Sequence, residues 1–213
     1  MNCNKKDLLL YAVTDRHWLG DKSLYEAVRE SLDGGVTFLQ LREKNLDDDA
    51  FREEALQIQK LCGEYDVPFI INDNVGVAAS IDADGVHVGQ SDMEAGDVRA
   101  KLGPYKILGV SAHTVEQAVL AEKRGADYLG VGAVFQTGSK ADVDNITFET
   151  LKAICEAVSI PVIAIGGITR DNVKTLAGSG ICGVAVISAI YAQKNIKEAT
   201  ADLKIQVETM VNS

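Results

Sequence analysis

The stretch PVIAIGG, residues 161–167, is a short apolar run rich in β-branched residues that ends in two glycines. Such a run is typical of a buried strand in a parallel sheet. In an open doubly wound sheet, the glycines that approach a phosphate would be expected after the first strand. Here the first apolar run is followed by TDRHW, residues 14–18, and the glycine pair follows the seventh. The position of the pair therefore favours a closed barrel over a doubly wound sheet.

Seven further runs of this kind alternate with amphipathic segments along the chain. The eight predicted strands are residues 8–14, 36–43, 68–73, 85–89, 106–112, 127–133, 161–167 and 183–188. Helices are predicted for residues 46–65, 114–126 and 194–212, and Thr114 is the expected N-cap of the second of these. No Pro-rich or Ser-rich linker interrupts the pattern. We therefore expect an α/β fold, a single (β/α)8 TIM barrel, as one domain over residues 1–213.

Glycines stand shortly before several predicted strands, as in GGVTFL, DGVHVG, GADYLG and GICGVAV. We interpret them as the left-handed turns that end the preceding helices. This weak internal repeat agrees with a chain built of successive strand–helix units.

Composition excludes several kinds of partner. The net charge of −10 argues against nucleic acids and anionic membranes. No apolar stretch approaches the length of a membrane span, and the N-terminus reads as a first strand rather than a signal peptide. The four cysteines are scattered without a C-x-x-C pair, which is typical of reduced thiols and predicts a cytoplasmic location. A homo-oligomeric assembly stays open.

The second predicted strand carries polar residues where a buried strand should be apolar. Gln40, Arg42 and Lys44 occupy every second position, and alternate side chains of a strand point the same way. A guanidinium offers a planar fork to phosphate oxygens, and an ammonium adds a point charge. In so acidic a chain, this local positive site predicts the binding of a diphosphate.

Two carboxylates follow neighbouring strands, Asp73 after the third and Asp92 after the fourth. Beside the cations, they suggest Mg²⁺ held by one or two carboxylates and by substrate phosphates. The plainer alternative is a set of ordinary ion pairs between these carboxylates and the cations.

A second anion site is predicted at the ends of the last two strands. Gly166 and Gly167 let the backbone approach an anion closely, and Ser188 stands at the matching place after strand eight. Phosphate sites of barrels are commonly built from the loops after strands seven and eight. The alternative is a tight turn made by the two glycines. With the diphosphate site, this arrangement predicts two phosphorylated substrates.

Ser111 and His113 share a face of the fifth predicted strand. Because no G-x-S-x-G elbow is present, we interpret Ser111 as a hydrogen-bond donor to leaving oxygens rather than as a nucleophile. His87 is expected inside the barrel as a core histidine. His17 and Trp18 follow strand one and either line the mouth or pack as an ordinary loop.

The polar segment 136–146, which contains Gly138 and Lys140, is interpreted as a mobile lid after strand six.

Taken in order, these strand-end segments resemble the thiamine phosphate synthase (thiamine-phosphate pyrophosphorylase) family over essentially the whole chain. The resemblance is carried by YAVTD (11–15), QLREK (40–44), IIND (70–73), GVHVGQSD (85–92), GVSAHT (109–114), GAVFQTGSK (132–140), AIGGI (164–168) and VIS (186–188). One departure is Gln136, where many relatives are expected to carry a proline that would stiffen the entry to the lid.

The resemblance implies an enzyme that joins a hydroxymethylpyrimidine diphosphate to a thiazole phosphate, with Mg²⁺, by loss of pyrophosphate and attack on a pyrimidine carbocation. The pyrimidine diphosphate would be bound by Gln40, Arg42, Lys44, Asn72, Ser111 and Lys140. The thiazole phosphate would be bound by Thr137, Ser139, Gly167, Ile187 and Ser188. Mg²⁺ would be held by Asp73 and Asp92. Their neighbours Leu41, Glu43 and Gly138 complete the predicted substrate-binding set, and the residues expected to act in catalysis are Arg42, Lys44, Ser111 and Lys140.

Two other functions stay open at this point. A thiazole tautomerase of the same superfamily would use the monophosphate site, but it has no need of a diphosphate cluster. A non-catalytic protein that senses thiamine phosphates would tolerate loss of the metal pair or of Lys140, and both are present.

Overall fold

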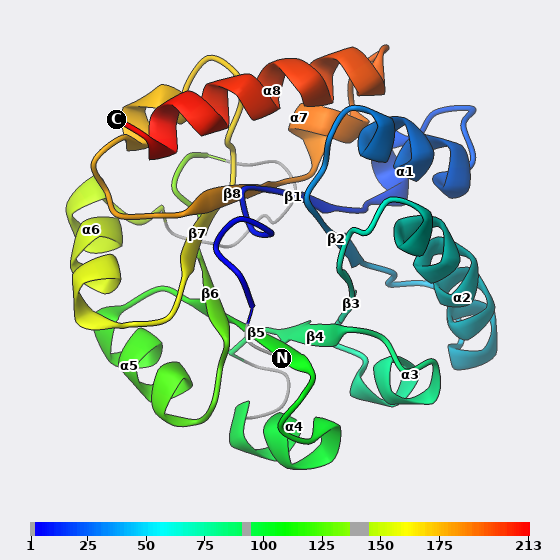
Figure 1. The fold of residues 1–213 in the computed structure, drawn as a ribbon, viewed down its shortest axis with the longest axis horizontal. Coiled ribbons are helices and arrows are strands. Elements are labelled where there is room, and N and C mark those ends of the chain that lie inside the picture. The colour runs from blue at the N-terminus through cyan, green and yellow to red at the C-terminus, as the bar shows by residue number, and fades with distance from the viewer. Residues whose placement is uncertain (1–2, 91–94, 137–144) are drawn as a thin grey trace.

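The computed structural model describes residues 3–90, 95–136 and 145–213. Eight parallel strands close into a barrel in chain order, because β8 pairs with β1 through Val184 and Leu10. The strands are β1 Leu10–Val13, β2 Phe38–Leu41, β3 Phe69–Asn72, β4 Gly85–Val88, β5 Ile107–Ala112, β6 Tyr128–Val131, β7 Val162–Ile165 and β8 Gly183–Val186. Figure 1 shows these strands as a ring with the helices outside it. The predicted (β/α)8 barrel is confirmed.

The helices follow the strands and cover the barrel from outside. They are α1 Leu24–Asp33, α2 Asp48–Glu64, α3 Val75–Ser80, α4 Ala95–Leu102, α5 Val115–Lys123, α6 Phe148–Ala157, α7 Ser188–Tyr191 and α8 Ile196–Val211, with short 3-10 turns η1 Arg16–Trp18 and η2 Val173–Leu176. Thr114 caps α5 as predicted, since its side chain accepts a hydrogen bond from the backbone of Gln117. None of these described helices is both long and apolar enough to cross a membrane.

The strands are shorter than the sequence predicts at one or both ends, and at the C-terminal end in every strand except β5. Strand β2 ends at Leu41, so only Gln40 of the three alternating polar residues lies on it, and Arg42 and Lys44 belong to the loop that follows. Strand β7 likewise ends at Ile165, before the glycine pair. The prediction that all three polar residues lie on one strand was therefore wrong, although all three line the pocket described below.

The glycines before strands have two different roles. Gly35 and Gly125 adopt positive φ values of 98° and 90°, as predicted for left-handed turns. Gly85 and Gly183 do not; they begin β4 and β8. A Cβ at Gly85 would lie 2.0 Å from the carbonyl oxygen of Ile107, so close strand approach excludes a side chain there. The prediction of a turn at Gly85 was therefore wrong, whereas before β8 the predicted turn is made by Gly180, with a φ of 94°.

Two apolar layers hold the barrel together. The outer layer lies between strands and helices and includes Leu39, Leu41 and Ile71. The inner layer fills the interior of the barrel toward the N-terminal ends of the strands. It includes Leu8, Tyr11, Phe38, Ile70, Ile107, Tyr128 and Ile163. In Figure 1 the segment before β1 lies across this end of the barrel. The segment before β1 thus covers the N-terminal end of the barrel, and the pocket described below opens at the other end.

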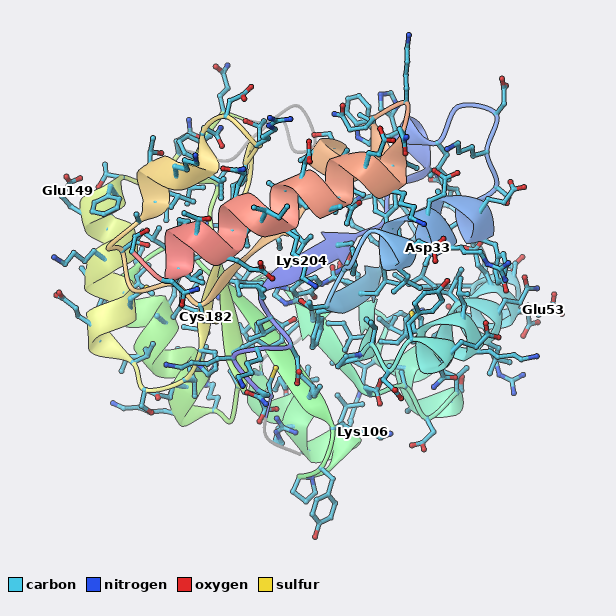
Figure 2. All side chains as sticks on the ribbon, turned by 45° about the horizontal axis from the view of Figure 1, so that its top comes forward. Asp33, Glu53, Lys106, Glu149, Cys182 and Lys204 are labelled. Atoms are coloured by element: carbon cyan, nitrogen blue, oxygen red, sulfur yellow. The ribbon has the colours of Figure 1, made fainter. Side chains whose placement is uncertain are left out.

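Hydrogen bonds from the residues that precede strands close the N-terminal end further. The carboxylates of Asp84 and Asp127 accept from the backbone N–H groups of Phe69 and Leu108, both at 2.8 Å. Asp127 also pairs with Arg99 at 2.6 Å. Other charged side chains lie on the outer helices, as Glu53 and Glu149 do at opposite edges of the molecule in Figure 2. Charge at this end and on the helices serves structure and the outer surface rather than the pocket.

Candidate functional site

A pocket of about 470 Å³ opens at the C-terminal ends of the strands. Strands β2 to β5 contribute the polar side chains of Gln40, Asn72, His87 and Ser111 to its lining. The opposite side, from β6 to β8, is lined by small or apolar residues, namely Gly130, Gly132, Ala133, Ile163, Ile165, Gly166, Gly167 and Ala185. One side of the pocket can therefore offer charged and polar side chains, and the other offers backbone.

The predicted phosphate-binding guanidinium is held in place by the end of strand β1. The backbone N–H of Arg42 donates to the hydroxyl of Thr14 at 2.9 Å, and its Nη1 pairs with Asp15 Oδ2 at 2.9 Å. Thr14 is fully buried, and the Arg42 side chain is only 10% exposed. Arg42 therefore reaches the pocket as a fixed group with the rest of its donor fork available to a ligand.

The neighbours of Arg42 divide between pocket and core. Lys44 is exposed and lines the pocket. The Leu41 side chain is fully buried against the helices, so only its backbone can serve a substrate. Glu43 is tied to Arg16 Nε at 2.9 Å, and Arg16 also pairs with Glu54. Burial and the nearby Glu54 raise the pKa of Glu43 above its ordinary value, although Arg16 opposes the shift. Glu43 thus braces the loop; it does not line this pocket, but it lines a neighbouring one of about 580 Å³ together with Lys44, Asn72 and Asp73.

Asn72 and Asp73 end strand β3 at the rim of the pocket. Asp73 has a φ of 61°, and its backbone N–H donates to the carbonyl of His87 at 2.9 Å. Its exposed carboxylate beside the Asn72 amide is a donor set that suits Mg²⁺, which takes one or two carboxylates and completes its shell with substrate phosphates. The described residues hold no cluster of three His, Cys, Asp or Glu side chains placed for a metal. Asp92, the predicted second ligand, lies outside them.

The glycine pair is required by its surroundings. Gly166 and Gly167 have φ values of 99° and 65°. A Cβ would lie 2.5 Å from Ala133 Cβ at the first and 2.4 Å from the carbonyl oxygen of Gln136 at the second. Asn172 fixes the turn, because its Nδ2 donates to the Gly167 carbonyl at 2.9 Å. The pair therefore packs against the loop after β6 while its backbone lines the pocket.

At the end of β8, Ile187 precedes helix α7 and Ser188 begins it. The first N–H groups of a helix have no partner within it, and Ser188 lines the same pocket as Gly167. The predicted lid residues Thr137, Gly138, Ser139 and Lys140 lie outside the described residues. His17 and Trp18 pack on each other at 4.8 Å between ring centroids and are not among the residues that line the pocket.

The structure adds polar pocket residues that sequence reasoning missed or undervalued. His87 donates to or accepts from Tyr128 at Nδ1 and Ser111 at Nε2, both at 2.9 Å. His113 Nδ1 donates to the Gly132 carbonyl at 2.5 Å, and Gln90 Nε2 donates to the Ser111 carbonyl at 2.5 Å. The prediction that His87 faces the barrel interior holds, but it lines the pocket instead of lying in a sealed core.

The sequence did contain a signal for one missed contact, the ion pair between Asp15 and Arg42. Asp15 lies two residues beyond β1, and the neighbouring strand β2 ends before Arg42; carboxyl ends of adjacent parallel strands meet at one edge. Pairing the first and second strand ends would have suggested an Asp15–Arg42 contact. The Tyr128 contact had no such signal, because β4 and β6 are not neighbours in the sheet.

Together, fold and pocket define a (β/α)8 barrel whose ligand site lies at the C-terminal ends of its strands. Comparisons with known proteins narrow this class. The family model described as thiamine monophosphate synthase matches residues 10–190. A thiamine-phosphate synthase of Clostridium botulinum is 46% identical over 207 residues, which cover 97% of each chain. One of Alkaliphilus oremlandii is 48% identical over 202 residues, covering 95% of this chain and 97% of the relative.

A solved structure agrees with the sequence comparisons. The thiamine phosphate pyrophosphorylase of Pyrococcus furiosus superposes with a TM-score of 0.89 at 40% identity, covering 97% of this chain and 98% of the other. The chain belongs to the thiamine monophosphate synthase family and is a transferase of thiamine biosynthesis.

Proposed function

We propose that this chain condenses 4-amino-2-methyl-5-hydroxymethylpyrimidine diphosphate with thiazole phosphate, yielding thiamine phosphate and pyrophosphate. One observation carries the proposal. A single pocket is lined both by the Arg42 and Lys44 cations after β2 and by a glycine turn and a helix start after β7 and β8. Such a pocket suits two phosphorylated substrates held face to face, and holding both in register supplies the proximity that a bimolecular reaction lacks in water.

The chemistry asks the protein mainly to stabilise departing charge. The bond between the pyrimidine methylene and the diphosphate oxygen breaks, and its electron pair leaves with pyrophosphate. The thiazole nitrogen then forms the new carbon–nitrogen bond with its lone pair. Since that nitrogen carries no proton, no general base is needed. Arg42, Lys44 and the predicted Lys140 are proposed to neutralise the leaving charge, and the Ser111 hydroxyl is proposed to donate to a leaving oxygen.

We propose that Asp73, with Asp92, holds Mg²⁺ against the diphosphate. When bound, the ion would neutralise charge on the leaving oxygens. The exposed Asp73 carboxylate and the Asn72 amide support this assignment for the described part of the site. On the other wall, the backbone of Gly167, Ile187 and Ser188 is proposed to bind the thiazole phosphate, together with Thr137, Gly138 and Ser139.

We further propose a cytoplasmic enzyme. The four cysteines are free thiols in the structure, in keeping with the expectation from their spacing. The expected partners are the two phosphorylated small molecules, and a homo-oligomer is left to a measurement of mass in solution.

The test is an assay of both products with the purified chain. Given both substrates and Mg²⁺, we expect pyrophosphate and thiamine phosphate in equal amounts. Chelating Mg²⁺ or omitting either substrate should reduce both products to background. Isomerisation of a thiazole phosphate without pyrophosphate release would instead indicate a tautomerase. Tight binding of thiamine phosphate with no turnover would indicate a non-catalytic binding protein.

A further inference from the structure

Five side chains from five strands form one continuous chain of hydrogen bonds through the barrel. Gln40 Nε2 donates to the Tyr11 hydroxyl at 2.5 Å, and this hydroxyl lies 2.9 Å from that of Tyr128. The Tyr128 hydroxyl lies 2.9 Å from His87 Nδ1, and His87 Nε2 lies 2.9 Å from Ser111 Oγ. This chain of hydrogen bonds begins at Gln40 and ends at Ser111, and both residues line the pocket.

The direction of these hydrogen bonds follows from counting protons. The Gln40 amide nitrogen can only donate, so the Tyr11 oxygen accepts and its own proton is left for Tyr128. Tyr128 then has its proton for His87 Nδ1. A neutral imidazole that accepts at Nδ1 carries its proton on Nε2 and donates it to Ser111 Oγ.

The last link leaves the proton of Ser111 free to point into the pocket. A reversed chain, which would begin with an accepting group at position 40, would turn the Ser111 proton toward His87 instead. Ser111 could then only accept from a ligand. The identity of the group that faces Tyr11 therefore decides whether Ser111 can donate to an anion.

The interior of the barrel shields these hydrogen bonds from water and leaves space for them. Tyr11 and Tyr128 are 1% and 0% exposed, so water does not compete for their hydroxyls. Burial raises the pKa of both hydroxyls, which keeps their protons in place at neutral pH. A Cβ at Gly109 would lie 2.2 Å from the Tyr128 hydroxyl oxygen and 2.5 Å from His87 Nδ1. The missing side chain at Gly109 thus makes room for the Tyr128–His87 contact.

We propose that Tyr128 is a positioning residue that fixes the Nε2–H tautomer of His87 and thereby turns the Ser111 hydroxyl into a donor toward the leaving diphosphate. This inference rests on the proposed function for the identity of the anion. The hydrogen-bond direction itself does not depend on it.

The first test is the tautomer of His87, measured by ¹⁵N NMR on the substrate-free protein. The chain has only three histidines, so His17→Gln and His113→Gln variants assign the signals. We expect the Nε2–H tautomer in the wild type and its loss in Tyr128→Phe, which removes the donor to Nδ1. Gln40→Glu, whose carboxylate only accepts, should reverse the chain and give the Nδ1–H tautomer. A His87 tautomer that is unchanged in both variants would overturn the proposal.

Tyr191→Phe is the matched control for loss of a buried tyrosine hydroxyl. Tyr191 is 1% exposed, its hydroxyl contacts that of Ser31 at 3.2 Å in the outer layer, and it is not among the residues that line the pocket. This variant should keep the His87 tautomer and the kcat of the wild type. If it shifted the tautomer as Tyr128→Phe does, the effect would be general loosening of the fold, and the proposal would fail.

The second test is kinetic. Tyr128→Phe should lower kcat at least about tenfold, with KM for the pyrimidine diphosphate changed by less than about threefold. In a Ser111→Ala background, the same substitution should have little further effect, because its influence passes through Ser111. Equal losses of kcat in both backgrounds would contradict the proposal. If the wild type made no thiamine phosphate, the proposed function would fail while the tautomer measurement would still decide the direction of the hydrogen bonds.

Discussion

The two walls of the pocket offer different groups to a ligand, side chains on one and backbone on the other. The wall from β2 to β5 presents side chains, with Gln40, Asn72, His87 and Ser111 on the strands and Arg42 just beyond them. The wall from β7 to β8 presents backbone, at a glycine turn and a helix start. Side chains can bring full charges and protons to a leaving group, whereas backbone N–H groups can hold a phosphate that takes no part in the reaction. The difference supports separate roles for the two substrates.

The walls also differ in what holds them. Arg42 depends on Thr14 and Asp15 from the neighbouring strand end. The glycine turn depends on the absence of side chains, since a Cβ at Gly166 or Gly167 would collide with the loop after β6. Substitutions on the two walls should therefore fail in different ways, and the predictions below use this.

The largest effect is expected from Arg42→Ala. Loss of the fixed guanidinium should lower kcat/KM for the pyrimidine diphosphate by at least about a hundredfold, roughly 2.7 kcal/mol of transition-state stabilisation. Arg42→Lys, which keeps the charge but loses the fork, should fall between the wild type and Arg42→Ala. Steady-state kinetics with the diphosphate varied provides the measurement. A near-normal kcat/KM would remove Arg42 from the diphosphate site.

Gly167→Ala tests the opposite wall. A φ of 65° and a Cβ only 2.4 Å from the Gln136 carbonyl oxygen should displace the turn. We expect KM for the thiazole phosphate to rise at least about tenfold, with KM for the pyrimidine diphosphate within about twofold. Gly178→Ala is the matched control, because Gly178 has a φ of 77° with nothing within 4 Å of its Cβ position. A rise in KM for the diphosphate alone would reverse the assignment of the walls.

Asp73→Asn tests whether Asp73 is a ligand of the proposed Mg²⁺ ion. Asparagine tolerates the left-handed backbone of this position, so the change removes charge with little strain. If Asp73 holds Mg²⁺ with Asp92, the Mg²⁺ concentration for half-maximal activity should rise about tenfold. A Mg²⁺ titration of initial rates measures it, with Asp66→Asn as control, since Asp66 also has a positive φ, of 55°, outside the pocket. An unchanged titration would mean that Asp73 is not a ligand.

The smallest effect is expected on the pH dependence of stability. It comes from Glu43, which follows Arg42 and pairs with Arg16. The pKa of Glu43 is raised above 4.5 in the folded chain, so the folded state holds its proton at a pH where the unfolded state has released it. This stabilisation is fully present below about pH 4.5 and is lost as pH rises through the raised pKa. The free energy of unfolding of the wild type minus that of Glu43→Gln should therefore fall as pH rises from 4.5. Urea denaturation at several pH values measures it, and a difference that rises would show the opposite shift.

Much of the fold could be predicted because short apolar runs repeat eight times. What failed were the strand ends and the reason for one glycine, Gly85. Periodicity cannot show where neighbouring strands diverge, and a glycine in a sequence does not reveal whether it serves a turn or a close approach.

The sequence predicted several residues of the candidate site, but it did not predict the hydrogen bonds that connect them. Gln40, Arg42, Asn72 and Ser111 were singled out, and the structure brings them to one pocket. Tyr11 and Tyr128 were missed because each sits in a run that reads as core. Their hydroxyls meet only because the barrel closes and brings β1 and β6 to face each other across its interior.

The most direct test of the two-wall account is separate binding of each substrate to Arg42→Ala and Gly167→Ala by titration calorimetry. The account predicts a crossover, in which Arg42→Ala weakens the pyrimidine diphosphate and spares the thiazole phosphate, while Gly167→Ala does the reverse. If both variants weakened the same substrate, or each weakened both alike, the two walls would not have separate roles.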